Sequence, residues 1–305
     1  MDLIINILEQ GFLFGIVAIG IYITYNILDF PDLSIDGTYP LGAAICAALL
    51  VKEVNPWIAI SIATVGGSLA GLVTAFLHVK LKISNLMSGI LVMIALYSVN
   101  LIVMGQSNIP LFNTKSVFNG DNKIITIAIV ILVVKLAFDF FLKTQLGNLL
   151  IAVGDNEQLV TSLGVNKNNV KILGLMISNG LVALSGALTA QYQGFSDSSM
   201  GTGVAVMALA SVIIGTSLFK KVSFVKATTL SIVGAIIYKL AIAMALKFGL
   251  NPNYLKLMTS IIVIIALSLN SNAFKIRGRR KRNKITVLEE GGDLNVEDSR
   301  IAQGL

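Results

Sequence analysis

Long apolar runs recur along most of this chain and alternate with short polar segments. A helix rises 1.5 Å per residue, so about twenty apolar residues cross the roughly 30 Å hydrocarbon core of a bilayer. Lipid requires every backbone polar group to be paired internally, which favours helices. The pattern therefore predicts an all-α fold, a polytopic helical membrane protein with about eight to nine membrane elements. The expected spans are 3–28, 56–77, 86–104, 124–142, 170–192, 204–218, 222–248 and 254–269, with a shorter element at 39–51.

The first polar segment, 29–40 (DFPDLSIDGTYP), contains two prolines and a glycine. These residues predict a break in the helix, which leaves 39–51 too short to cross a bilayer alone. We expect 39–51 to be half of a broken or re-entrant element, tolerated only where protein or a water-filled cavity surrounds its backbone. The short run 204–218 is a second candidate for such an element.

The same segment carries three carboxylates, Asp29, Asp32 and Asp36. A carboxylate at membrane depth is costly and indicates a functional group by default. Capping of the broken element from a solvated interface explains Asp32 and Asp36 without any such role. Asp36 is the candidate for a carboxylate that contacts a transported molecule or gates its path.

Composition agrees with a membrane location: 55% of the 305 residues are hydrophobic and 13% are charged. Soluble domains carry about 25% charged residues. The net charge of +7 does not indicate nucleic-acid binding, because seven of the basic residues fall in 275–284, directly after the last expected span. That placement follows the positive-inside rule and predicts a cytoplasmic C-terminus.

The basic residues also predict the side of each loop. Counting spans back from the tail puts every basic loop on one side, and the N-terminus lies outside if 39–51 crosses and inside if it turns back. We expect 1–272 to form the membrane domain and 273–305, basic and then acidic, to form a disordered cytoplasmic tail. The loops expected in the cytoplasm are 80–82, 147–171 and 220–221, and those expected outside are 106–123 and 249–253.

The largest polar interruption is 147–166, GNLLIAVGDNEQLVTSLGVN. Asp155 can cap a short helix, with Gln158 reaching back in a capping box. An apolar strip of Leu159, Val160 and Leu163 would follow, and Gly164 would end the helix. Such a helix has little to bury within its own chain, so we expect it to dock on another protein at the membrane surface. An ordinary capped loop helix is the alternative.

Two spans carry polar residues on one helical face, which must turn inward because polar groups in hydrocarbon need partners. Hydrogen bonding between packed helices and the lining of a substrate path both explain these faces. The faces comprise Asn85, Gly89, Met93, Tyr97, Asn100 and Met104 in one span, and Ser178, Ser185 and Thr189, with Asn179 beside them, in the other.

Nearer the membrane edge, Asp139 could pair with Lys143 at i+4.

The sequence contains no metal-ligand cluster, no catalytic triad and no Gly-x-x-x-x-Gly-Lys-Ser/Thr phosphate loop. We therefore expect no cofactor, no metal and no ATPase activity in this chain. Cys46 is the only cysteine, which excludes a disulfide within the chain.

The stretch AVGDNEQLVTSLGVNKNNVKILGLMISNGLVALSGALTAQ resembles the coupling segment and following span of permeases of bacterial ABC importers, of the branched-chain amino acid and ribose type. The later stretch MALASVIIGTSLFKKVSFVKATTLSIVGAIIYKL resembles the distal half of that family. Segments 29–44 and 82–107 are similar to its tryptophan/tyrosine-type branch. The resemblance extends to about residue 270 and implies a type II-like ABC importer permease.

The resemblance also implies partners and roles. This chain would act in a bacterial plasma membrane together with cytoplasmic ABC ATPase subunits and an extracytoplasmic substrate-binding (lipo)protein. It would pair with a second permease copy, expected as a homodimer. It would import a small metabolite, an amino acid and by its branch an aromatic one, by alternating access. ATPase coupling would fall to Gly154, Asp155, Asn156, Glu157, Leu159, Val160, Leu163 and Gly164, and the substrate path to Asp36, Asn85, Met93, Tyr97, Asn100, Ser178 and Asn179.

Other transport classes remain open at this point. An ion-coupled secondary transporter would need a carboxylate or histidine relay and broken helices in symmetric halves. The chain supplies Asp36 without a symmetric mate. An ABC importer for a sugar or nucleoside, or a membrane scaffold that transports nothing, are further alternatives.

Overall fold

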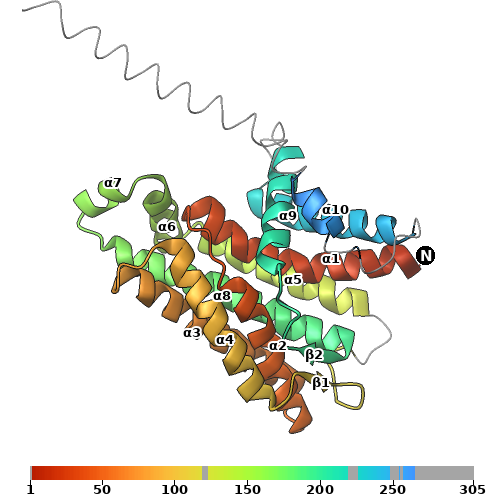
Figure 1. Ribbon diagram of the computed structural model, residues 1–305. Helices are drawn as coiled ribbons and strands as arrows, with labels where there is room; N and C mark the ends of the chain where they lie inside the picture. Colours follow the sequence, from red (N-terminus) through yellow and green to blue (C-terminus); the bar gives the residue numbers. More distant parts are fainter. Residues whose placement is uncertain (1, 119–122, 219–225, 248–253, 255–256, 265–305) are drawn as a thin grey trace, which may run out of the picture.

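The computed structural model describes residues 2–118, 123–218, 226–247, 254 and 257–264, which fold into a bundle of helices (Figure 1). Some of the predicted segments lie outside the described residues: 255–256 and 265–269 of the expected span 254–269, 222–225 and 248 of the expected span 222–248, and the tail 273–305. The helices are α1 (Asp2–Ile21) with its π-helical continuation η1 (Tyr22–Ile27), α2 (Ile35–Val51), α3 (Pro56–Val79), α4 (Asn85–Met104), α5 (Lys123–Phe141), α6 (Gln145–Asp155), α7 (Glu157–Ser162), α8 (Lys167–Gln193), α9 (Val204–Leu218) and α10 (Ala227–Lys247).

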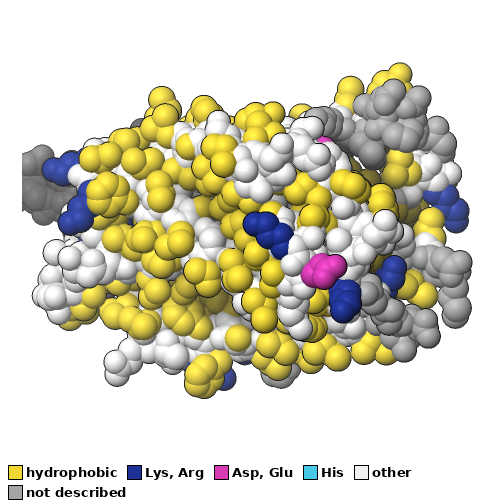
Figure 2. Space-filling view, turned by 90° about the horizontal axis from the view of Figure 1, so that it is seen from below, with side chains coloured by type: hydrophobic (Ala, Val, Ile, Leu, Met, Phe, Trp, Pro, Cys, Tyr) yellow, Lys and Arg dark blue, Asp and Glu magenta, His cyan; other side chains and the backbone are white. Residues whose placement is uncertain are grey.

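Six helices of the described part are long and apolar enough to cross a membrane, and α2 and α9 are shorter apolar helices. The predicted polytopic helical fold is confirmed. Apolar side chains cover most of the face shown in Figure 2, and its few charged side chains gather in small groups. Helices α3, α4 and α5 expose large apolar side chains along their lengths, as lipid contact requires.

Helix α8 is the axis of the bundle, and α1 runs antiparallel to it. The Ser185 hydroxyl donates to the Leu13 carbonyl at 2.7 Å, and the Ser178 hydroxyl donates to the Gly20 carbonyl at 2.7 Å. Since α8 has 27 residues, it is about 40 Å long. The helices α6 and α7 precede it and strand β2 (Phe195–Asp197) follows it, so they lie at opposite ends of the molecule (Figure 1). We call these the α7 end and the β end.

The N-terminus lies at the β end. The Tyr192 hydroxyl, near the end of α8, donates to the Glu9 carboxylate at 2.8 Å. The other end of the first span, η1, reaches α6, where a Cβ added to Gly154 would lie 1.5 Å from the Ile27 carbonyl oxygen. Helix α1 and its continuation η1 therefore run from the β end to the α7 end.

The break after the first span is shorter than predicted. Helix α2 begins at Ile35, so Pro40 lies inside it, and the expectation that the helix stays broken as far as Pro40 is wrong. Pro40 has no N–H and cannot donate to the Asp36 carbonyl. Gly201 packs directly against that carbonyl oxygen, since a Cβ added to Gly201 would lie 2.0 Å from it. Val51 shares a cavity wall with Ile109 of strand β1 (Asn108–Pro110), so α2 extends to the β end.

Two glycine pairs permit close helix contacts. A Cβ on Gly67 would lie 2.2 Å from the Ala183 Cβ, and one on Gly71 would lie 2.4 Å from the Leu175 carbonyl oxygen, which brings α3 against α8. Gly11 and Gly15 likewise face α10. Small residues at such contacts let backbones approach in lipid.

Two short strands close the β end. Strand β1 (Asn108–Pro110) pairs antiparallel with β2 (Phe195–Asp197), with Ile109 opposite Ser196. The all-α prediction missed this pair, because three-residue strands leave no periodic signal in the sequence.

Candidate functional site

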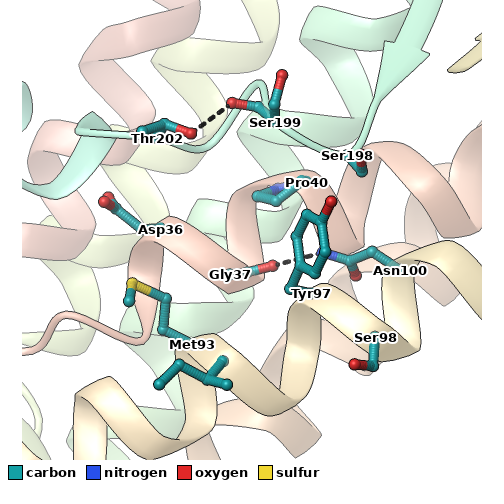
Figure 3. Close-up of a pocket in the computed structure, with 11 residues that line it drawn as sticks. Asp36, Gly37, Pro40, Met93, Tyr97, Ser98, Asn100, Ser198, Ser199 and Thr202 are labelled. Carbon is teal, nitrogen blue, oxygen red and sulfur yellow. Dashed lines mark hydrogen bonds between the residues drawn. The ribbon is translucent and has the colours of Figure 1, made fainter. Parts of the chain in front are cut away.

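A cavity of about 480 Å³ lies between α2, α4 and the segment that follows β2 (Figure 3). Its volume is within the range of small-molecule sites, roughly 300–1,000 Å³. The cavity lies nearer the β end, since the α4 residues that line it lie in the second half of that helix. The lining residues are Asp36, Gly37, Pro40, Met93, Ile94, Tyr97, Ser98, Asn100, Ser198, Ser199 and Thr202.

Asp36 links two short helices at the edge of this cavity. Its Oδ2 accepts from the Gly203 N–H at 2.9 Å and its Oδ1 accepts from the Ala205 N–H at 2.7 Å. It therefore caps the N-terminus of α9, although it belongs to the first turn of α2. A carboxylate at this position also complements the positive end of the α9 dipole.

Asp32 lies deeper, away from this cavity. Its Oδ1 accepts from the Ser34 N–H at 2.8 Å and its Oδ2 accepts from the Asn179 Nδ2 at 2.9 Å. The Asn179 Oδ1 in turn accepts from the Thr38 hydroxyl at 2.7 Å. The expectation of a solvated interface at Asp32 is wrong, because its side chain is buried within this network of hydrogen bonds.

Asn100 is fully buried on the α4 wall. Its Nδ2 donates to the Gly37 carbonyl at 3.2 Å, whereas its Oδ1 has no hydrogen-bond partner among the described residues. Leaving such an acceptor unsatisfied costs about 1–3 kcal/mol. Tyr97, 52% exposed, and Met93 line the same wall.

Three of the seven path candidates do not line this cavity. Ser178 and Asn179 face α1 and the start of α2, and Asn85 lies at the first residue of α4. Sequence reasoning missed the lining hydroxyls of Ser198, Ser199 and Thr202. Their signal was available in the polar run 196–203, which follows the span 170–192.

Asp139 forms a separate buried cluster where α5 meets α10. It accepts from Lys135 and Lys226, each at 2.9 Å, and from the Thr228 hydroxyl at 2.7 Å. The predicted pairing of Asp139 with Lys143 is wrong, because α5 ends at Phe141 and the i+4 geometry does not extend to residue 143.

The segment 147–166 forms two helices instead of one. Asp155 is the last residue of α6, and Asn156 caps α7, its Oδ1 accepting from the Gln158 N–H at 3.0 Å. The predicted cap at Asp155 is wrong by one residue, because packing of Leu150 and Val153 extends α6 through residue 155. Gly164, at φ +77°, ends the helix as predicted.

The apolar strip of α7 is divided between core and surface. Val160 is buried, Leu163 is 69% exposed, and the Leu159 side chain lies outside the described residues. Asp155 and Asn156 are also exposed. Among the described side chains of 155–164, the surface thus presents polar groups and the large apolar side chain of Leu163.

Ion pairs fix α7 to α8. The Glu157 carboxylate accepts from Lys167 at 2.8 Å and from Lys171, both in the first turns of α8. These hydrogen bonds lower the pKa of Glu157 below its usual range. With Gly154 against the Ile27 carbonyl oxygen, the segment contacts both α8 and the end of the first span.

Comparison with known proteins places this fold in a family. Residues 3–268 match the family described as branched-chain amino acid transport system, permease component. No solved structure matches the chain significantly.

Individual relatives cover nearly the whole chain. A tyrosine transport system permease protein of Clostridioides difficile is 52% identical over 269 residues, which are 88% of this chain and 91% of the relative. An uncharacterized protein of Rickettsia prowazekii is 34% identical over 88% of this chain and 98% of its own. A ribose import permease protein of Escherichia coli K12 is 24% identical over 87% of this chain and 84% of its own.

Proposed function

We propose that this chain, which belongs to the family of branched-chain amino acid transport system permease components and is a multi-pass membrane protein, imports an aromatic amino acid. As the permease component of an ABC transport system, it would take its energy from ATP hydrolysed in partner subunits. The cargo is inferred from the relative named for tyrosine transport, which at 52% identity is far nearer than the ribose permease at 24%.

The observation that carries the coupling proposal is the α6–α7 segment. Its contacts with the end of α1 and with α8 give it two rigid connections to the spans. An ATPase docked on the exposed Asp155, Asn156 and Leu163 would move both spans when nucleotide binding closes the ATPase pair. Such movement is a rigid-body transition that shifts the chain between outward- and inward-facing states.

Sidedness follows from this coupling. The α7 end then faces the cytoplasm, and the β end, with the N-terminus, faces outside. A substrate-binding protein would deliver its ligand to the β end. The basic run 275–284 favours a cytoplasmic C-terminus in a bacterial plasma membrane.

The substrate path would include the cavity at Asp36, Met93, Tyr97 and Asn100. Its open side carries the exposed Ile94 and Tyr97 beside a carboxylate, a combination ill suited to lipid. We infer that a second copy of this chain covers that side, which makes a homodimer with the path between the copies. Ser178 and Asn179 would hold the helices of each copy together.

The test is reconstitution of the chain with its cognate ATPase and binding protein in proteoliposomes. The expected result is uptake of labelled L-tyrosine that requires ATP on the α7 side and persists without an ion gradient. Ribose in place of tyrosine is the matched control. Uptake driven by an ion gradient without ATP, or uptake of ribose alone, would contradict the proposal.

A further inference from the structure

We propose that the cavity between α2, α4 and residues 198–202 recognises the ammonium group and the aromatic ring of the transported molecule. The permease would then add selectivity of its own to that of its binding protein. This inference rests on the proposed import of an aromatic amino acid.

The polar edge of the cavity is made of acceptors. Among its lining residues Asp36 alone carries a formal charge, and each carboxylate oxygen keeps a further lone pair after accepting from Gly203 or Ala205. The Asn100 Oδ1 also has no donor among the described residues, but it is fully buried behind the cavity wall and is not exposed to a ligand. An ammonium group offers three donors and a positive charge, which match the Asp36 carboxylate.

Two of the three hydroxyl groups on the opposite wall, those of Ser199 and Thr202, do not favour a carboxylate. The Thr202 hydroxyl donates to the Ser199 carbonyl at 2.8 Å (Figure 3). The Ser199 hydroxyl donates to the Asp197 Oδ1. Their protons are engaged within the protein, so these oxygens also face the cavity as acceptors. A ligand carboxylate would meet the Asp36 charge without a compensating cation among the lining residues.

The remaining wall suits an aromatic ring. Tyr97 is half exposed and lies with Met93 and Ile94 on the α4 side, and Pro40 completes the apolar surface (Figure 3). Aromatic rings pack favourably on one another and on methionine sulfur. The ring and the ammonium group of one ligand can therefore be held at the same time.

The experiment measures binding of labelled L-tyrosine to the permease–ATPase complex in nanodiscs, without the binding protein. Two competitors separate the ends of the ligand: tyramine keeps the ammonium group and lacks the carboxylate, and 3-(4-hydroxyphenyl)propionate has the reverse. Tyramine is expected to compete nearly as well as unlabelled tyrosine, and the propionate at least about tenfold more weakly, the ratio for loss of one charged hydrogen-bonded contact.

Variants of α4 test the ring. Tyr97→Leu is expected to weaken tyrosine binding roughly two- to tenfold, the range for loss of an aromatic pair, while Tyr97→Phe stays within about twofold. Val99→Ala, which changes a neighbouring residue outside the cavity, is the matched control and is expected to bind as the wild type.

Equal competition by tyramine and the propionate, unchanged binding by Tyr97→Leu, or no measurable tyrosine binding would overturn the inference. The uptake assay in proteoliposomes separates this failure from that of the proposed function. ATP-driven tyrosine uptake with equal competition rejects the ammonium site alone. Absence of tyrosine uptake by the wild-type system rejects the import proposal and the site with it.

Discussion

The Asp36 Oδ1 accepts a 2.7 Å hydrogen bond from the Ala205 N–H and so joins residues 169 positions apart in the chain. The two helices that begin there, α2 and α9, are the short apolar helices of the described structure. Their N-terminal ends meet at the cavity edge instead of at a membrane surface. The Asp36 carboxylate thus joins the two helices and also supplies the negative charge of the candidate site.

The first prediction concerns that carboxylate. In Asp36→Asn one oxygen becomes an NH₂ donor and faces a backbone N–H, so a capping bond is lost. We expect the free energy of unfolding to fall by about 1–2 kcal/mol and tyrosine uptake to fall with it. The melting temperature of the purified protein and uptake in proteoliposomes measure the two effects.

Asp36→Glu separates the two roles. It keeps the charge and both oxygens, so partial recovery of uptake is expected, with a smaller loss of melting temperature. Full stability and full uptake in Asp36→Asn would show that neither the cap nor the charge matters.

The second prediction concerns the exposed surface of α7. Leu163→Ala removes a large side chain that is 69% exposed, so the fold of the chain should not change. We expect less co-expressed ATPase to be recovered with this variant, and still less with the Asp155/Glu157/Leu163 triple alanine variant. Pull-down from detergent extracts, with the bound ATPase quantified, is the measurement.

Phe112→Ala is the matched control, because Phe112 is an exposed apolar residue near the β end. Its ATPase recovery should equal that of the wild type. If all these variants recover the ATPase equally, the α7 surface is not its docking site.

The limits of sequence reasoning are visible at these same elements. The span 204–218 was predicted with its observed bounds, because a continuous apolar run has few alternatives. The cap of α7 fell at Asn156 instead of Asp155, because the length of α6 is set by burial of Leu150 against distant helices. Local capping signals carry no information on such contacts.

The candidate site was predicted in part for a similar reason. Helical spacing put Met93, Tyr97 and Asn100 on one face, and the structure places all three at one cavity. The same reasoning could not separate them from Ser178 and Asn179, whose polar groups hold α8 to the first two helices. A polar residue in a span must find a partner, but its sequence does not say whether the partner is protein or substrate.

The third prediction is a pH dependence at Glu157. Hydrogen bonds from Lys167 and Lys171 lower its pKa in the folded state, so the ion pairs contribute stability above the unfolded pKa of about 4.3. That contribution is lost as the pH falls through the lowered pKa. Because Glu157 is 41% exposed, solvent screening keeps it below about 1 kcal/mol.

Limited proteolysis within 155–166 at pH 7 and at pH 3 measures this effect. Wild-type protein should become more susceptible at the lower pH. Glu157→Gln should be susceptible at both values and show no difference between them. A wild-type chain with equal resistance at both values would contradict the role of these ion pairs.

The fourth prediction concerns the contact between α5 and α10. Asp139 is 5% exposed and accepts from two lysines and the Thr228 hydroxyl, so Asp139→Ala leaves three donors without their shared acceptor. We expect a loss of about 1–3 kcal/mol in the free energy of unfolding, less than the roughly 3–5 kcal/mol for a fully buried pair, because Lys226 is partly in solvent. Lys143→Ala should leave the melting temperature unchanged, since Lys143 makes no ion pair with Asp139. A similar loss in both variants would mean that charge near this membrane edge, and not the cluster, stabilises the helices. If neither variant loses stability, α10 is held by its apolar contacts with α1 and α9 alone.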